Sequence, residues 1–167
     1  SDEIHSDMAL FGNRHIPFAS VSERAAQISI TFAAPTKTFN MAGIVSSFAI
    51  VPNEELRNRF YGWLKANELD EPTLFAPIAT IAAYRKGEEW RRQMLAYVED
   101  NVFFVEDFCR EHIPGIRPLR PQASFLVWLD CRDLGLKHKE LLNLFIDKAH
   151  LALNDGRMFE IGRASCR

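Results

Sequence analysis

The chain has 167 residues, of which 47% are hydrophobic and 25% are charged, and its formal net charge is −2. This composition is that of a globular protein, and the length is sufficient to bury a hydrophobic core. No cluster of Lys and Arg marks a surface for nucleic acid or anionic lipid, and no apolar run reaches the ~20 residues of a membrane-spanning helix.

The first part of the sequence predicts two strands joined by a loop. Residues 28–34 alternate apolar and polar side chains, which is the period of a half-buried strand. Residues 46–52 form a second, apolar run that is typical of a strand covered on both faces. Pro35 and Gly43 predict the loop between them, and this loop carries Lys37.

Three helices are predicted next. Asn53 is a suitable N-cap for the first, whose apolar residues fall on one helical face. A second helix is predicted from about Pro72 to Gly87, and Pro77 must either lie in its first turn or kink it. The longest helix is predicted to follow, with an apolar stripe along residues 88–109.

The last part of the sequence predicts a linker and a small αβ unit. Residues 113–122 are rich in Pro and Gly and are the best candidate for a domain boundary. Residues 124–130 then predict a strand, residues 138–150 a helix, and residues 151–156 a short strand that ends in a turn. Strands that alternate with helices indicate an α/β fold.

The three cysteines, Cys109, Cys131 and Cys166, form no Cys-x-x-Cys pair. A small, odd number of scattered cysteines fits a reducing compartment better than a disulfide framework or a zinc site. We therefore expect a cytoplasmic protein.

Three side chains near the start of the chain are candidates for chemistry. A lysine is usually a solvated surface residue, but Lys37 stands in a turn held by Pro35 between apolar strands. An amine in such a turn can lose solvent, which lowers its pKa and favours condensation with a carbonyl group. Asp2 and His5, three residues apart, carry little signal alone, and with Asp7 they could also be read as metal ligands of no established spacing.

Five motifs in the same order carry a resemblance to a known family. They are SDEIHSD at 1–7, APTKTFNMAG at 34–43, IVPNEELRNRF at 50–60, AAYRKGEEW at 82–90 and PQASFLVWLD at 121–130. Up to about Phe159 the chain resembles the C-terminal part of a fold-type I, pyridoxal-phosphate-dependent enzyme of the class I/II aminotransferase family. The first two motifs are most similar to its cystathionine β-lyase (C–S lyase) branch, whose members have His where most aminotransferases have Tyr.

The resemblance implies roles for four side chains. Lys37 would be the Schiff-base lysine that holds pyridoxal 5'-phosphate and later moves the α-proton of the substrate. Asp2 would face the pyridine nitrogen and keep it protonated, and His5 would lie near the phenolic oxygen of the cofactor. Thr36 would donate a hydrogen bond to the cofactor phosphate.

The chain departs from the family pattern in two places. Many relatives have Ser or Thr three residues before the lysine and Arg eight residues after it, whereas this chain has Ala34 and Val45. Phosphate binding would therefore depend on other groups. Residues 160–167 do not match the family, so the arginine that grips the substrate carboxylate is assigned neither to Arg163 nor to Arg167.

The resemblance also implies a domain organisation. Residues 1–52 would end a large cofactor-binding domain, residues 53–113 would form interdomain helices, and residues 114–167 would form a small C-terminal αβ domain. We expect the chain to be a piece of a longer protein, because family members have a long segment before this point. The family further implies a homodimer and an amino-acid substrate.

The leading functional hypothesis is a C–S β-lyase that breaks the Cβ–S bond of cystathionine or a similar cysteine conjugate after removal of the α-proton. An aminotransferase of the same fold is the first alternative. A second is a catalytically inert fragment or assembly module, and a third is a metal-binding domain. The aromatic side chains of the predicted helices are expected in a core or in a subunit interface.

Overall fold

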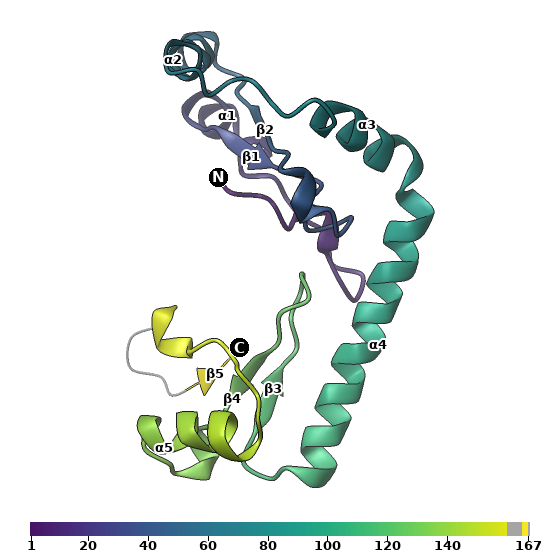
Figure 1. Ribbon diagram of the computed structural model, residues 1–167, viewed down its shortest axis with the longest axis vertical. Helices are drawn as coiled ribbons and strands as arrows, with labels where there is room; N and C mark the ends of the chain where they lie inside the picture. The colour runs from purple at the N-terminus through teal and green to yellow at the C-terminus, as the bar shows by residue number, and fades with distance from the viewer. Residues whose placement is uncertain (160–164, 167) are drawn as a thin grey trace. The chain divides into compact units, whose positions relative to one another are not determined.

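The computed structural model describes residues 1–159 and 165–166, and the chain divides into two compact units, Ser1–Leu95 and Ala96–Arg167 (Figure 1). The division falls within helix α4 (Glu88–His112) and not in a loop. Arg163 and Arg167 lie outside the described residues. Among the helices that the structure describes, none is both long and apolar enough to cross a membrane.

A small sheet organises the first unit. Strand β1 (Thr31–Ala33) is antiparallel to strand β2 (Phe48–Ile50), with Thr31 opposite Ile50. The first residues of the chain lie parallel to β1 on its other side, where Asp2 forms a bridge with Phe32. The Glu3 N–H donates to the Phe32 carbonyl at 2.8 Å, and the Phe32 N–H donates to the Ser1 carbonyl at 2.8 Å. The two parallel segments therefore end at the same edge of the sheet.

The predicted strand over residues 28–34 is shorter than expected. Residues Glu23–Ile28 form helix α1, and β1 begins only at Thr31. The Ser22 hydroxyl accepts a hydrogen bond from the Ala25 N–H at 3.1 Å, so a local N-cap starts the helix. Local capping outweighs the alternating pattern at the first residue of the predicted strand.

The helix boundaries that rest on caps are confirmed, as is the place of Pro77, but the helix start predicted at about Pro72 is wrong, because the helix begins only at Ala76. Helix α2 (Glu54–Ala66) begins after Asn53, whose side chain accepts a hydrogen bond from the Leu56 N–H at 2.9 Å. Helix α3 (Ala76–Lys86) has Pro77 in its first turn, where the missing N–H costs nothing. Gly87 ends α3, and α4 begins at the next residue.

The second unit contains a three-stranded antiparallel sheet in the order β3-β4-β5. Its strands are β3 (Arg117–Leu119), β4 (Trp128–Asp130) and β5 (Ser165–Cys166). Helix α5 (His138–Asn143) continues as one π-helical turn over Leu144–Lys148, and Cys131, Leu141 and Phe145 form the core.

Two sequence predictions for this unit are wrong. The predicted linker over residues 113–122 contains β3, which tolerates Pro118 because β3 is an edge strand and needs no N–H on its outer side. The predicted strand over residues 151–156 is absent, and the only regular element there is a 3₁₀ turn, Gly156–Met158.

A buried carboxylate joins β3 to β4. Asp130 accepts hydrogen bonds from Arg132 Nη2 at 2.5 Å and from Arg117 Nη2 at 2.7 Å. The bond from Arg132 is the main reason that the pKa of Asp130 lies well below its ordinary value, and Arg117 acts in the same direction against the effect of burial. The carboxylate that the central strand β4 buries is therefore paired.

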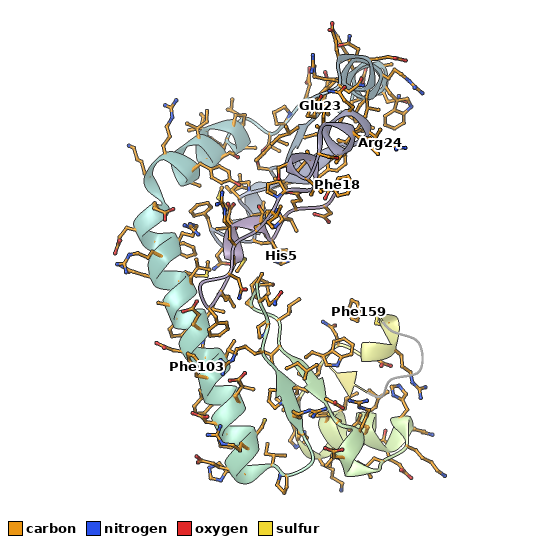
Figure 2. All side chains as sticks on the ribbon, turned by 180° about the vertical axis from the view of Figure 1, so that it is seen from behind. His5, Phe18, Glu23, Arg24, Phe103 and Phe159 are labelled. Atoms are coloured by element: carbon orange, nitrogen blue, oxygen red, sulfur yellow. The ribbon has the colours of Figure 1, made fainter. Side chains whose placement is uncertain are left out.

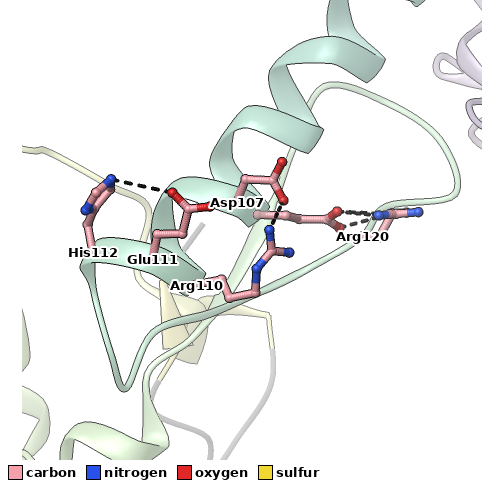
Figure 3. A network of polar contacts seen from close by, with 6 residues as sticks. Asp107, Arg110, Glu111, His112 and Arg120 are labelled. Carbon is pink, nitrogen blue, oxygen red and sulfur yellow. Dashed lines mark hydrogen bonds and ion pairs between the residues drawn. The ribbon is translucent and has the colours of Figure 1, made fainter.

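The end of α4 carries a group of surface ion pairs (Figure 3). Arg110 contacts Asp107 at 2.5 Å, and Arg120 binds Glu106. The Arg120 guanidinium also lies 4.8 Å from the ring centroid of Phe103. Surface pairs of this kind are each worth only about 0–1 kcal/mol. The pair between Arg120 and Glu106 joins the segment after the helix to α4, whereas the pair between Arg110 and Asp107 lies within the helix.

Many large apolar side chains of the helices remain exposed. Trp63 of α2 is 60% exposed, and Tyr97 and Phe104 of α4 are 68% and 66% exposed. The prediction that these side chains lie in a core is therefore wrong for the described chain. The alternative, that they lie in a subunit interface, remains a prediction.

Candidate functional site

The turn after β1 presents the Lys37 side chain. The Phe39 N–H donates to the Pro35 carbonyl at 2.9 Å, and the Met41 N–H donates to the Thr36 carbonyl at 3.0 Å. Pro35 is fully buried and so is Thr38, whereas Lys37 is exposed. The buried residues anchor the turn and leave the amine accessible.

The segment that carries Asp2 and His5 leaves the sheet at the same edge as the Lys37 turn, because it runs parallel to β1. Asp2 is exposed, and its Oδ1 accepts a hydrogen bond from the Ile4 N–H at 3.2 Å. His5 is half-buried, and its carbonyl accepts from the Met8 N–H at 3.0 Å, which closes a 3₁₀ turn. The fold therefore brings two predicted segments, thirty residues apart in sequence, to one edge.

The predicted phosphate-binding part of the site is less complete. Thr36 is half-buried beside Lys37. Val45, which stands where many relatives have Arg, is 72% exposed and has φ 50°. A β-branched residue in this left-handed region is strained, and it has no group to offer to a phosphate.

Sequence analysis missed a buried acid between Asp2 and His5. Glu3 is 7% exposed, and its carboxylate accepts hydrogen bonds from His15 Nε2 at 2.8 Å and from the Phe18 N–H at 2.9 Å. Phe18, which supplies the second of these donors, is labelled in Figure 2. Burial is the largest single influence and acts to raise the pKa of Glu3, but the hydrogen bonds from His15, Phe18 and Ser1, with the electrostatic effect of His15, together hold the pKa below the ordinary value of 4.5. The sequence did contain a signal for the burial of Glu3. Side chains alternate along an extended segment, so Glu3 points away from the side on which Asp2 lies.

Replacement of Glu3 by Ala is expected to destabilise the first unit by about 1–3 kcal/mol near neutral pH, because the His15 and Phe18 donors lose their acceptor. The pKa of Glu3 is depressed in the folded state, so its stabilising effect is present above pH 4.5 and is lost as the pH falls through the folded pKa. Urea unfolding at pH 7 and at pH 3 measures this, with the exposed Glu71→Ala as control. Equal destabilisation at both pH values would contradict the assignment.

The face of the sheet opposite Asp2 lines a cavity of about 820 Å³. Glu3, Thr31 and Ala33 contribute from the sheet side, and Tyr84 and Arg91 contribute from α3 and α4. Lys37, Asp2, His5 and Thr36 are not among its lining residues. The predicted site residues therefore lie at the sheet edge and outside this cavity.

The groups at the edge fit an aldehyde cofactor with a basic ring nitrogen. Within the described residues, neither Lys37 nor Asp2 takes part in an ion pair, so the amine and the carboxylate are both available. A metal centre finds no such support, because no group of three His, Cys, Asp or Glu side chains in the described part of the chain could hold an ion. Asp7, one of the three candidate ligands, accepts a hydrogen bond from the Tyr84 hydroxyl.

Comparison with known proteins gives a consistent result. No protein-family model matches the chain. The chain is 41% identical over 162 residues to the cystathionine β-lyase PatB of Bacillus subtilis (strain 168). The matched region covers 97% of this chain and 42% of PatB.

Two solved structures that contain pyridoxal phosphate have the same fold over the matched part. Cystalysin from Treponema denticola superposes with a TM-score of 0.93 at 32% identity, over 99% of this chain and 42% of that one. A C–S lyase from Staphylococcus hominis superposes with a TM-score of 0.80 at 31% identity, over 99% and 42% of the two chains. The chain spans about 42% of the length of the relatives that it matches. Over that part, the chain is a homologue of the cystathionine β-lyases and has the fold of pyridoxal-phosphate-dependent C–S lyases.

Proposed function

We propose that the protein to which this chain belongs is a pyridoxal-phosphate-dependent C–S β-lyase that acts on cysteine S-conjugates such as cystathionine. The observation that carries the proposal is the 41% identity with PatB along 97% of the chain. The exposed Lys37 amine at the same sheet edge as Asp2 supports it, because the reaction needs a primary amine and a carboxylate near one cofactor.

Lys37, Asp2, His5 and Thr36 are the residues that would hold the cofactor. Pyridoxal phosphate, when bound, supplies an aldehyde that condenses with amines and a ring that accepts electron density. Lys37 Nζ is the amine for that condensation. The Asp2 carboxylate would hold a proton at the ring nitrogen, His5 would donate toward the phenolic oxygen, and Thr36 would donate toward the phosphate.

Lys37 Nζ would be the base that takes the proton from Cα of the substrate. The electron pair left at Cα forms a Cα–Cβ double bond while the Cβ–S bond breaks, and the thiolate leaves with the sulfur electrons. Addition of one water to the unsaturated amino acid then gives pyruvate and ammonia. The turn anchored by Pro35 and Thr38 keeps the amine in place for both tasks.

An aminotransferase is the alternative within the same fold, and Lys37 removes the same proton in that reaction. The products separate the two. With L-cystathionine and added cofactor, we expect thiol, pyruvate and ammonia in equal amounts and without a keto-acid acceptor. A requirement for a keto acid that becomes aminated would establish the aminotransferase instead. Absence of turnover, with PatB active in the same assay, would favour the inert fragment.

We also propose that the protein is a cytoplasmic homodimer. Support for a subunit interface comes from three exposed apolar residues at the start of α3, where Leu74 is 78%, Phe75 is 67% and Ile78 is 63% exposed. Support for a reducing compartment comes from the cysteines of the sequence, which are few and odd in number and form no Cys-x-x-Cys pair. Sedimentation analysis tests the dimer, and fractionation of the source cells tests the location.

A further inference from the structure

Tyr84, near the end of α3, contacts three separate segments of the first unit. Its ring packs edge-on against Phe39 with the centroids 5.6 Å apart, and against Phe48 of β2 with the centroids 6.1 Å apart. Its hydroxyl donates a hydrogen bond to Asp7 Oδ2 at 3.3 Å. Tyr84 therefore joins Phe39 and Asp7, which lie on different segments of the first unit.

Phe39 connects this residue to the Lys37 turn. Phe39 lies two residues after Lys37, and its N–H closes the turn by donating to the Pro35 carbonyl. The Phe39 ring also lies 6.0 Å from the Trp90 ring and passes close to Gly87, where a Cβ atom would come within 2.5 Å of Phe39 Cε1. The junction of α3 and α4 therefore packs against the ring of Phe39, the residue whose N–H closes the lysine turn.

Asp7 connects the same junction to the segment that carries His5. The Arg91 Nη1 donates to the Asp7 carbonyl at 3.0 Å, next to the bond from Tyr84. Burial, together with Asp7, raises the pKa of Tyr84 to about 12, so the phenol stays protonated and acts as a donor at neutral pH. Asp7 lies in the 3₁₀ turn Ser6–Met8 that follows His5 directly.

We propose that Tyr84 is a positioning residue of the cofactor site. Tyr84 keeps the Lys37 turn and the Asp2–His5 segment in a fixed position relative to each other. This proposal rests on the proposed function, because the coupling between the two segments serves catalysis only if both segments bind the cofactor. Tyr84 touches no reacting atom. It acts through Phe39 on one segment and through Asp7 on the other, from an element that neither segment belongs to.

Two variants separate the two contacts. Tyr84→Phe removes the bond to Asp7 and keeps the ring contacts, so amide hydrogen exchange at Met8 should rise about fivefold while exchange at Phe39 and Met41 stays unchanged. Tyr84→Leu removes both contacts and should raise exchange at all three amides. Tyr97→Phe, at a 68% exposed tyrosine, is the matched control and should change none of them.

The second measurement is selectivity of cofactor trapping. After pyridoxal phosphate and borohydride treatment, peptide mapping gives the share of label at Lys37 among the six lysines of the chain. We expect this share to fall several-fold in Tyr84→Leu and to stay unchanged in Tyr97→Phe. A purely structural role would raise exchange without moving the share, and that result would overturn the proposal.

The remaining outcomes are also decisive. Unchanged exchange in Tyr84→Leu would overturn the proposal whatever the labelling shows, because no coupling would exist. Uniform labelling of the unsubstituted chain, with exchange that still responds to Tyr84→Leu, would instead contradict cofactor binding by this chain alone and leave the coupling supported. The failure of one is therefore distinguishable from the failure of the other.

Discussion

Replacement of Lys37 by Ala is expected to abolish selective trapping of pyridoxal phosphate by this chain and to lower any lyase turnover by at least about 10²–10⁴-fold, the usual loss when a positioned base is removed. The physical reason is that no other group at this edge is a primary amine. Among the six lysines, only Lys37 stands in the turn after β1. Borohydride reduction followed by mass mapping measures the trapping.

Two further variants sharpen this prediction. Lys37→Arg keeps the positive charge but cannot form the imine, so it should lose trapping as completely as Lys37→Ala. Lys65→Ala removes an exposed lysine in the last turn of α2 and should leave trapping at Lys37 intact. Label that persists in Lys37→Ala at a single other lysine would place the site elsewhere, and label spread evenly in every variant would show that this chain alone does not bind the cofactor.

Gly87→Ala is expected to destabilise the first unit by about 1–3 kcal/mol, the usual cost of overpacking. The added Cβ would lie 2.5 Å from the Ala83 carbonyl oxygen and 2.5 Å from Phe39 Cε1. Gly87 has a negative φ of −91°, so the cost is steric and not conformational. Because the displaced ring closes the lysine turn, trapping at Lys37 should fall together with stability.

Gly62→Ala in α2 is the matched control, and it is expected to change stability in the opposite direction. Its Cβ would meet nothing within 4 Å, and the residue lies inside a helix, where Ala is favoured over Gly by about 0.5–1 kcal/mol. Urea unfolding of the two variants should therefore shift the midpoint in opposite directions. A stabilising effect of Gly87→Ala would show that Phe39 moves aside at no cost and that the junction is not tightly packed.

The helices were predicted well because their signals are local. Asn53 caps α2 with its own side chain, Pro77 lies in the first turn of α3, and Gly87 ends α3. Each signal acts over three or four residues, and nearby tertiary contacts did not reverse it.

The strands were predicted less well because strand formation depends on distant partners. Pro118 lies in a strand only because β4 is available as a neighbour on one side of an edge position. The segment 151–154, with three apolar residues, forms no strand. No local pattern distinguishes these two segments.

The residues of the candidate site likewise divide into those that the sequence indicated and those that only the structure revealed. Lys37, Asp2, His5 and Thr36 were found through motif resemblance, which records chemistry at known spacings, and their catalytic roles stay predictions. Residues without a motif role were missed, although Glu3 anchors the segment of Asp2 and Tyr84 contacts both segments of the site.

The sequence by itself determined the helix caps and the turn that presents an amine, and its motifs indicated the protein family. Only the tertiary structure decided that the segments of Asp2 and Lys37 share one sheet edge. That arrangement requires the parallel pairing of Asp2 with Phe32, across thirty residues of chain. Such pairing depends on which backbone groups find partners when the whole unit packs, and residue type alone does not specify it.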